Sequence, residues 1–337
     1  MDKKLFDHFQ KGDQLSIKNP DYQHILEELF LFLVRNDHVK EDSTVKAFLP
    51  GSVAERLKNG VIAAKTACVV SGLEEVTYLC NTFTKLTPHA FVRDGEIVSP
   101  GTKVLSLDGS AKEILSHERA LLNILQRMSG IATETGKYVA KVQHLKLPNP
   151  PMIAATRKTP WMHIDKKAVA VGGGATHRLD LKDGILLKDN HLELLRQEYS
   201  LKNEAEAISY AIGHSDIVDK KIAIEVEVKT DDAAFVAVTS WKKKKLQNPF
   251  IIMLDNFTPE RAKKVIAQLR HPEFISGSRK MLNQVQHDKE NVDIFFEASG
   301  GITLDNVADF AKTGVDIISI GVLTHSPKAA DLSLDIV

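Results

Sequence analysis

The segment from Asp293 to Ser326 constrains the fold more than any other stretch of this 337-residue chain. An apolar run at Asp293–Ala298 stops at Ser299-Gly300-Gly301, and a second apolar run at Asp316–Ile320 stops at Gly321. Short apolar runs that end at glycine are typical of buried strands followed by tight turns. The segment therefore predicts two strands of one sheet, each followed by a glycine turn.

The residues between these two strands predict a helix. Thr303 is suited to be its N-cap, apolar residues recur behind it at helical spacing, and Gly314 is suited to end it. Glycine turns at the ends of parallel strands suit a phosphate, because the main chain can approach closely and a helix N-terminus adds partial positive charge. In (β/α) barrels the phosphate site often follows the last two strands. We predict a phosphate site here, with ordinary turns as the alternative.

The totals exclude several classes of protein. Apolar residues make up 43% of the chain and charged residues 26%, a globular balance, and the formal net charge is zero. A neutral total argues against a general binder of nucleic acid or of membrane surfaces. Cys68 and Cys80 have no metal-binding spacing and are expected to be reduced thiols. The charged N-terminus is unlike a signal peptide, and no run of about 18 apolar residues occurs, so we expect a cytoplasmic protein.

The N-terminal third lacks a regular alternation of strand and helix, and we predict a small α+β domain there. Tyr22–Val34 has the periodicity of an amphipathic helix. Phe91–Val98 predicts a hairpin whose turn is Asp94-Gly95. A long helix is predicted for Ser116–Val142, with an interruption near Ser129-Gly130.

From Pro148 onward the pattern changes to apolar runs separated by segments that suit helices. Besides the two strands already named, the runs are Met152–Ala155, Ile185–Leu187, Ile222–Val228 and Phe250–Leu254. Strands that are apolar throughout, in alternation with helices, predict a parallel sheet covered by helices, most simply a (β/α) barrel. Polar residues recur at the C-terminal ends of these strands, which is the edge where barrel enzymes carry their chemistry.

The polar residues at this edge predict a polyanionic ligand. The cationic or basic side chains are Arg157, Lys158, His177, Arg178 and Lys188. Cations gathered at one edge are costly unless an anion joins them, and arginine suits carboxylates and phosphates. Glu227 and Asp255 are carboxylates suited to Mg²⁺ or to sugar hydroxyls. A phosphorylated sugar with further anionic groups fits this set. Taken singly, each of these residues is as consistent with an ordinary surface or structural role.

Three further stretches have structural interpretations. The basic run Trp241–Lys245 is predicted to be a solvated loop. Gly277–Asp288 is predicted to be a surface insertion, and Gly172-Gly173-Gly174 a close-packing turn that allows His177 and Arg178 to point inward.

The chain resembles the quinolinate phosphoribosyltransferase family, also called carboxylating nicotinate-nucleotide pyrophosphorylases. The resemblance covers nearly the whole chain. It rests on the stretches His117–Thr133, Ala155–Thr159, Gly172–His191, Ile224–Val228, Met253–Phe257, Phe296–Thr303 and Ile318–Ser326, and more weakly on Ser71–Val76 and Arg93–Thr102.

This resemblance implies an N-terminal open-faced α/β sandwich domain at residues 1–116 and an incomplete TIM-like (β/α) barrel of about seven strands at residues 117–328. The tail 329–337 would return to the N-terminal domain. The implied reaction joins quinolinate to phosphoribosyl pyrophosphate with Mg²⁺. Its products are nicotinate mononucleotide, pyrophosphate and CO2, a step of de novo NAD biosynthesis. The implied assembly is a homodimer with shared active sites.

The resemblance also implies roles for individual residues. Lys158, Lys188, Glu227 and Asp255 would be catalytic, and Glu227 and Asp255 would hold Mg²⁺, in part through water. The quinolinate and phosphoribosyl pyrophosphate sites would use Arg119 from the neighbouring subunit and Thr156, Arg157, Lys158, His177, Arg178, Lys188, Glu227 and Asp255. The ribose phosphate would be held by Ser299, Gly300, Gly301, Ile320, Gly321 and Val322.

Departures from the family pattern occur at Asp37–Thr44, which lacks the usual glycines, and at Pro160–His163, where a Pro-Gly turn is usual. Alternatives with the same fold are a nicotinate phosphoribosyltransferase and a pyrophosphorylase homologue associated with molybdenum transport. Alternatives of another class are a barrel aldolase or isomerase with Lys188 as a Schiff-base nucleophile, and a catalytically silent binding protein.

Overall fold

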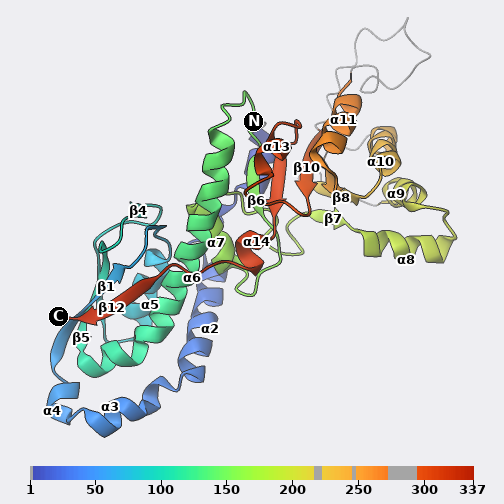
Figure 1. The fold of residues 1–337 in the computed structure, drawn as a ribbon. Helices are drawn as coiled ribbons and strands as arrows, with labels where there is room; N and C mark the ends of the chain where they lie inside the picture. Colours follow the sequence, from blue (N-terminus) through green and yellow to red (C-terminus); the bar gives the residue numbers. More distant parts are fainter. Residues whose placement is uncertain (1–2, 216–221, 245–247, 272–293) are drawn as a thin grey trace, which may run out of the picture. The chain divides into compact units, whose positions relative to one another are not determined.

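The computed structural model describes residues 3–215, 222–244, 248–271 and 294–337. The chain packs as two compact units (Figure 1). The parallel-sheet unit comprises Met1–Phe9, Ala140–Ala154 and His177–Ile320. The antiparallel-sheet unit comprises Gln10–Val139, Ala155–Thr176 and Gly321–Val337.

The parallel-sheet unit is built on six strands in the order β6-β11-β10-β9-β8-β7. Their bounds are β6 Met152–Ala155, β7 Ile185–Leu187, β8 Ile224–Val228, β9 Phe250–Asp255, β10 Ile294–Ser299 and β11 Ile317–Ile320. The pairings from β11 through to β7 are parallel. The apolar runs predict all six strands, and each prediction is confirmed, because strands with both faces covered are apolar at nearly every position.

Helices follow the strands along the chain, as a (β/α) fold requires. The helices of this unit are α1 Lys3–Phe9, α8 Asp189–Tyr199, α9 Glu204–Gly213, α10 Asp231–Lys244, α11 Pro259–Leu269 and α13 Val307–Ala311. α11 shows why such a helix begins where it does: the Thr258 hydroxyl accepts the Arg261 N–H, and Pro259 occupies the first turn. The predicted fold class, a small sheet domain joined to a parallel (β/α) sheet, is confirmed. The sheet has six strands within the described ranges, where about seven are expected.

The loop predicted at Trp241–Lys245 is wrong as far as Lys244, because Trp241–Lys244 form the last turn of α10. Trp241 is fully buried, and its ring stacks on Phe250 of β9 with 4.2 Å between the ring centroids. This apolar contact holds the helix end on the sheet, and the lysines extend that helix. Lys245 lies outside the described residues.

Of two other predictions in this unit, one is wrong and one lies outside the described residues. Thr303 is not a helix N-cap, because α13 begins only at Val307 and is preceded by Asn306. The Asn306 carboxamide instead accepts the Thr303 N–H at 2.8 Å and closes the turn after Gly301. The predicted insertion Gly277–Asp288 lies outside the described residues.

The antiparallel-sheet unit contains a four-stranded sheet in the order β12-β1-β5-β3 and a separate two-stranded pair, β2-β4. The strands are β1 Leu57–Ala64, β2 Cys68–Val69, β3 Thr87–Ala90, β4 Ile97–Val98, β5 Lys103–Ser110 and β12 Leu332–Ile336. The tail 329–337, expected to return to the N-terminal region, contains β12. This strand pairs antiparallel with β1, with Leu334 opposite Ile62.

The helices of this unit are α2 Pro20–Asn36, α3 Ser43–Phe48, α4 Gly51–Ala54, α5 Leu73–Phe83, α6 Ala111–Gln143, α7 His163–Val171 and α14 Val322–His325, with 3-10 turns at Gly12–Gln14 and Val39–Glu41. The predicted helix Tyr22–Val34 is confirmed within α2. Asn19 caps α2, and the apolar face of this helix buries Tyr22, Leu26 and Phe30.

The predicted hairpin at Phe91–Val98 is wrong. β3 pairs with β5, and β4 pairs with β2, so the strands on either side of the Asp94-Gly95 turn have different partners. The Asp94 carboxylate instead accepts the backbone N–H groups of Leu73 and Glu74 at the start of α5. Aspartate at this turn therefore serves as a helix cap supplied from a distant part of the chain.

The predicted interruption near Ser129-Gly130 is also wrong, because α6 is one continuous helix of 33 residues. Gly130 is required by packing: a Cβ at this position would lie 2.1 Å from the carbonyl oxygen of Lys328. Glycine here allows the returning tail to lie directly on the helix backbone.

The predicted division at residues 116 and 117 stays a prediction, because the two units are defined by packing and α6 contributes residues to both. No helix in the described part of the chain is long and apolar enough to cross a membrane.

Candidate active site

Four predicted site residues lie at the C-terminal ends of neighbouring parallel strands. Lys188 directly follows β7, Glu227 is the next-to-last residue of β8, and Asp255 ends β9. Ser299 ends β10 and is opposite Asp255 in the register of the pair. The parallel pairing therefore brings a cation, two carboxylates and a hydroxyl to one edge of the sheet.

The charges at this edge act on one another. Burial raises the pKa of the half-buried Glu227 above its ordinary value, and the Asp255 carboxylate raises it further. The Lys188 ammonium opposes this increase. Beside them, Lys229 forms a 2.7 Å ion pair with Asp189 at the start of α8. The arrangement suits a ligand with a cationic centre, because two carboxylates would each gain a partner.

The turn after β10 is built for glycine. Gly300 and Gly301 have φ angles of 92° and 62°, in the left-handed region. A Cβ at Gly300 would lie 2.3 Å from the carboxamide oxygen of Asn256, and the Asn256 N–H donates to the Ser299 carbonyl at 2.9 Å. The turn is thus packed against the end of β9. Ile320, the last residue of β11, is buried.

His177 and Arg178 are buried in the parallel-sheet unit. Nε2 of His177 lies 3.5 Å from Glu225 and 3.7 Å from Glu297. The Arg178 guanidinium donates to the Gly184 carbonyl at 3.2 Å. Burial raises the pKa of Glu225 well above its ordinary range, the Glu297 carboxyl adds to the increase, and Arg178 opposes it.

The remaining predicted residues belong to the antiparallel-sheet unit. Arg119 lies on α6 with 55% of its side chain exposed. Arg157 and Lys158 are exposed after β6, where the Lys158 N–H donates to the Thr156 hydroxyl at 3.2 Å. A Cβ at Gly321 would lie 3.6 Å from Cδ of Lys158, so the Lys158 side chain passes beside the start of α14. Val322 is the first residue of that helix.

Two family models match the chain. Residues 42–129 match the N-terminal domain of quinolinate phosphoribosyl transferase, and residues 131–335 match its C-terminal domain. The second match alone covers more than half of the 337 residues. The chain belongs to the quinolinate phosphoribosyltransferase family.

Curated relatives agree with this family. A probable nicotinate-nucleotide pyrophosphorylase [carboxylating] of Methanocaldococcus jannaschii is 34% identical over 298 residues, covering 88% of this chain and 92% of the relative. A protein of the same name from Archaeoglobus fulgidus is 37% identical over 277 residues, covering 81% of this chain and 92% of the relative. Both relatives match at nearly their full length.

Solved structures share the fold. NadC from Streptococcus pyogenes superposes with a TM-score of 0.71 at 28% identity, covering 93% of this chain and 97% of that one. Human nicotinic acid phosphoribosyltransferase has a TM-score of 0.53 at 13% identity, a likeness of fold alone.

Glu297 is a residue of this family member that pattern reasoning missed. It is a fully buried carboxyl inside the apolar strand β10. A charged residue in an otherwise apolar run was the available signal, since such a residue needs a partner when buried. Its partner Glu225 is far away in the sequence, so the pair was not visible.

A second missed group supports the loop after β6. The Arg127 guanidinium binds both carboxylate oxygens of Asp165 at 2.7 Å and the Thr324 carbonyl at 3.0 Å. The same guanidinium lies 5.1 Å from the centre of the Trp161 ring. The unusual Pro160–His163 segment is therefore held by α6 through a cation over its tryptophan, and Met162 within it adopts a φ of 48°. The predicted close-packing role of Gly172 is confirmed, since a Cβ there would lie 2.5 Å from the Ala132 carbonyl.

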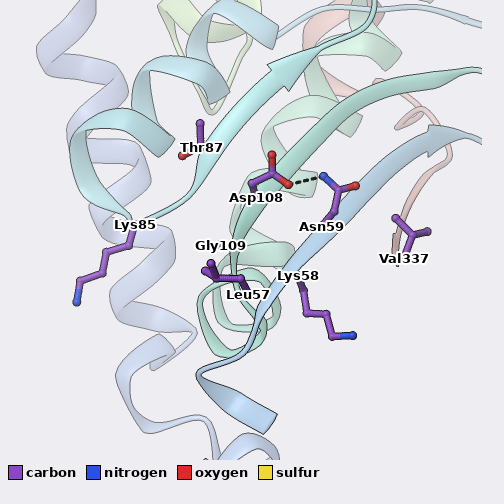
Figure 2. Close-up of a pocket in the computed structure, with 8 residues that line it drawn as sticks. All are labelled: Leu57, Lys58, Asn59, Lys85, Thr87, Asp108, Gly109 and Val337. Carbon is purple, nitrogen blue, oxygen red and sulfur yellow. Dashed lines mark hydrogen bonds between the residues drawn. The ribbon is translucent and has the colours of Figure 1, made fainter. Parts of the chain in front are cut away.

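The pocket shown in Figure 2 contains none of the predicted site residues. It is an open hollow of about 570 Å³ on the antiparallel sheet, lined by Leu57, Lys58, Asn59, Lys85, Thr87, Asp108, Gly109 and Val337. Within this hollow the Asn59 carboxamide donates to the Asp108 carboxylate (Figure 2). A second hollow of about 370 Å³ is lined by Asp37, His38, Val39, Glu41, Asp42, Ser43, Leu115 and Ser116. Ser116 lies one helical turn before Arg119. Neither hollow alters the assignment of the strand-end residues.

Proposed function

We propose that this chain transfers the phosphoribosyl group from phosphoribosyl pyrophosphate to quinolinate and releases CO2, forming nicotinate mononucleotide and pyrophosphate in de novo NAD biosynthesis. The carboxylating nicotinate-nucleotide pyrophosphorylases among its relatives support the reaction type. The observation that carries the proposal is the set of charged strand ends, Lys188, Glu227, Asp255 and the Ser299–Gly301 turn, on one sheet edge.

The proposed roles follow from the family resemblance and from the charges of the side chains. Arg119, Thr156, Arg157, Arg178 and Lys188 serve the two carboxylates of quinolinate, and His177 belongs to the same proposed site. Lys158 serves the phosphoribosyl pyrophosphate. The ribose phosphate is bound by Ser299, Gly300, Gly301, Ile320, Gly321 and Val322, where bare backbone suits an anion. Two carboxylates require more cations than the single carboxylate of nicotinate, which favours the diacid.

The chemistry requires positioning and charge balance. The ring nitrogen of quinolinate forms a bond to the anomeric carbon while the bond from that carbon to pyrophosphate breaks. Glu227 and Asp255 offset the positive charge that builds on the ribose in the transition state. The ring nitrogen is then cationic, and its charge stabilises the electron pair that remains on the adjacent ring carbon when the carboxylate leaves as CO2. That carbon then uses this pair to bond a proton. No covalent intermediate with the protein is needed.

Glu227 and Asp255 are the residues that would hold Mg²⁺. Their donor set fits this ion, which takes one or two protein carboxylates and completes its shell with water and phosphate oxygens. Burial raises the pKa of Glu227, and the Asp255 carboxylate adds to the increase. The bound ion would neutralise the pyrophosphate leaving group.

A steady-state assay tests the proposal. The protein is incubated with phosphoribosyl pyrophosphate and Mg²⁺, and quinolinate and nicotinate are offered in separate reactions. We expect nicotinate mononucleotide and one equivalent of CO2 from quinolinate alone, and loss of activity in EDTA that excess Mg²⁺ restores. Product from nicotinate alone would overturn the specificity. Trapping of a carbonyl substrate on Lys188 with borohydride would favour the aldolase alternative instead.

A further inference from the structure

A buried cluster of three ionisable side chains lies in the parallel-sheet unit. It consists of His177 with Glu225 of β8 and Glu297 of β10, strands that both pair with β9. Each of the three side chains is at least nine-tenths buried. The Phe9 ring covers the imidazole, with 5.0 Å between the ring centroids. Buried polar groups need hydrogen-bond partners, so the contacts within the cluster determine which atoms carry its protons.

The contacts determine which nitrogen of His177 carries the proton. The backbone N–H of Arg178 donates to Nδ1 of His177 at 2.6 Å. Nδ1 therefore acts as an acceptor, and the proton of the neutral ring is on Nε2. This Nε2–H group lies between the two glutamates, at 3.5 and 3.7 Å. Neither ring nitrogen has a lone pair left for a metal, which argues against a metal site although the three residues have ligand types.

The two glutamates need a proton as well. Within the described residues, one oxygen of Glu225 and both oxygens of Glu297 are buried without a hydrogen-bond partner. Two ionised carboxylates can only accept and repel one another at close range. A proton held between the two carboxyls makes a hydrogen bond between them and leaves one negative charge facing Nε2–H.

We propose that Glu225 and Glu297 are positioning residues that hold His177 in the Nε2–H form, and that His177 thereby holds the backbone of Arg178. The inference rests on the proposed function in that Arg178 is taken to bind the diacid. With both ring nitrogens engaged by the protein, His177 acts on the substrate through Arg178.

Nitrogen NMR of the imidazoles tests the cluster without reference to activity. The protein has 13 histidines, and the signal of His177 is assigned by its loss in the full-length variant His177→Gln. We expect a neutral ring protonated on Nε2 near pH 7.5, with no change of tautomer when quinolinate is added to saturation. A proton on Nδ1, or a switch of tautomer with quinolinate, would overturn the proposal.

Kinetics of two substitutions test the positioning role. Glu297→Gln replaces the shared proton with an amide N–H, and we expect the KM for quinolinate to stay within about 3-fold of the wild-type value. Glu297→Ala removes the partner, and we expect that KM to rise about 10-fold or more while the KM for phosphoribosyl pyrophosphate stays within about 2-fold. Glu193→Gln, on the exposed face of α8, is the matched control.

The measurements are made where every variant is fully folded by circular dichroism. Equal damage from Gln and Ala at Glu297, or a loss of kcat and of both KM values that follows the melting temperature, would overturn the positioning role. If the wild-type protein makes no product from quinolinate, the proposed function fails. In that case the NMR tautomer and calorimetric binding of quinolinate to the Glu297 variants still decide the inference.

Discussion

The Glu75 carboxyl in α5 lies in a place that disfavours its charge. It is fully buried and accepts a 2.7 Å hydrogen bond from the Tyr22 hydroxyl, and its other oxygen has no partner among the described residues. Burial is the main cause that raises its pKa from an ordinary value near 4.5 to about 7, and the Asp94 carboxylate adds to it. The Tyr22 hydrogen bond and the Lys167 ammonium oppose the increase.

Glu75→Gln should therefore stabilise the protein only at higher pH. A folded-state pKa above the unfolded value means that the folded state holds the proton more tightly. Well below pH 4.5 the Glu75 carboxyl is protonated in both states, so it costs no folding free energy. Above about pH 7 the carboxyl must ionise in the folded state, and the full free-energy cost applies. The full difference corresponds to about 3 kcal/mol. Urea unfolding should show Glu75→Gln gaining on the wild type as pH rises from 5 to 8, and a gain that is independent of pH would contradict the assignment. Glu28→Gln, at an exposed site on α2, should show no such trend.

At the scale of elements, α6 organises the antiparallel-sheet unit by what it packs against. The backbone of the tail lies on it at Gly130, and the Ala330 N–H donates to the Gln126 carbonyl at 2.8 Å. Its Arg127 binds Asp165 of α7 and the carbonyl of Thr324 in α14. One helix therefore fixes the tail, the loop after β6 and the start of α14.

Gly130→Ala should destabilise the protein by about 1–3 kcal/mol, because the new methyl group would overlap the Lys328 carbonyl and force the tail away. Gly136→Ala in the same helix is the control. A Cβ there would be no closer than 3.8 Å to any neighbour, so this change should be neutral or stabilise by about 0.5–1 kcal/mol. Thermal unfolding compares the two variants, and equal effects would show that tail packing is not the cause.

Arg127→Ala should lower the free energy of unfolding by about 3–5 kcal/mol, because it leaves the fully buried Asp165 carboxylate without its two-point partner. The double variant Arg127→Leu/Asp165→Leu should cost less than Arg127→Ala, since no buried charge is left unpaired. Denaturant unfolding of both variants measures the difference. A double variant less stable than Arg127→Ala would contradict this account of the ion pair.

At the scale of the whole molecule, the exposed Arg119 bears on assembly. Its guanidinium lies 3.8 Å from Glu118, and more than half of the side chain is exposed. A cation left exposed on a packed helix fits a residue that serves a neighbouring subunit. The family resemblance implies a homodimer with shared sites, and we propose that Arg119 is the residue each subunit supplies to its neighbour.

Mixing inactive subunits should restore activity if the sites are shared. Arg119→Ala and Lys188→Ala should each be inactive with quinolinate. After subunit exchange, half of the dimers are mixed and each contains one complete site, so about a quarter of the wild-type activity should return. Native mass spectrometry verifies the exchange. Verified mixed dimers without activity would show that Arg119 acts within its own subunit.

The parts of the fold that were predictable depend on neighbours in the chain. Each of the strands β6 to β11 is an apolar run that can be recognised from its own residues. α2 can be recognised in the same way, from its cap Asn19 and its apolar face of Tyr22, Leu26 and Phe30. The strand-end residues could be grouped because parallel strands all place their C-terminal ends at one edge. Arg119 required the family resemblance, since nothing in its local pattern separates it from a surface arginine.

The sequence by itself determined the family, the parallel sheet and the residues that end its strands, because local periodicity and long motifs indicate each of them. The tertiary structure alone decided the partners of β3 and β4, the unbroken course of α6, and the meeting of Glu297 with Glu225 and His177. The physical reason is that each of these depends on contacts between residues distant in the chain. A strand's partner, the space beside a glycine and the charge facing a buried carboxyl exist only once the chain has folded.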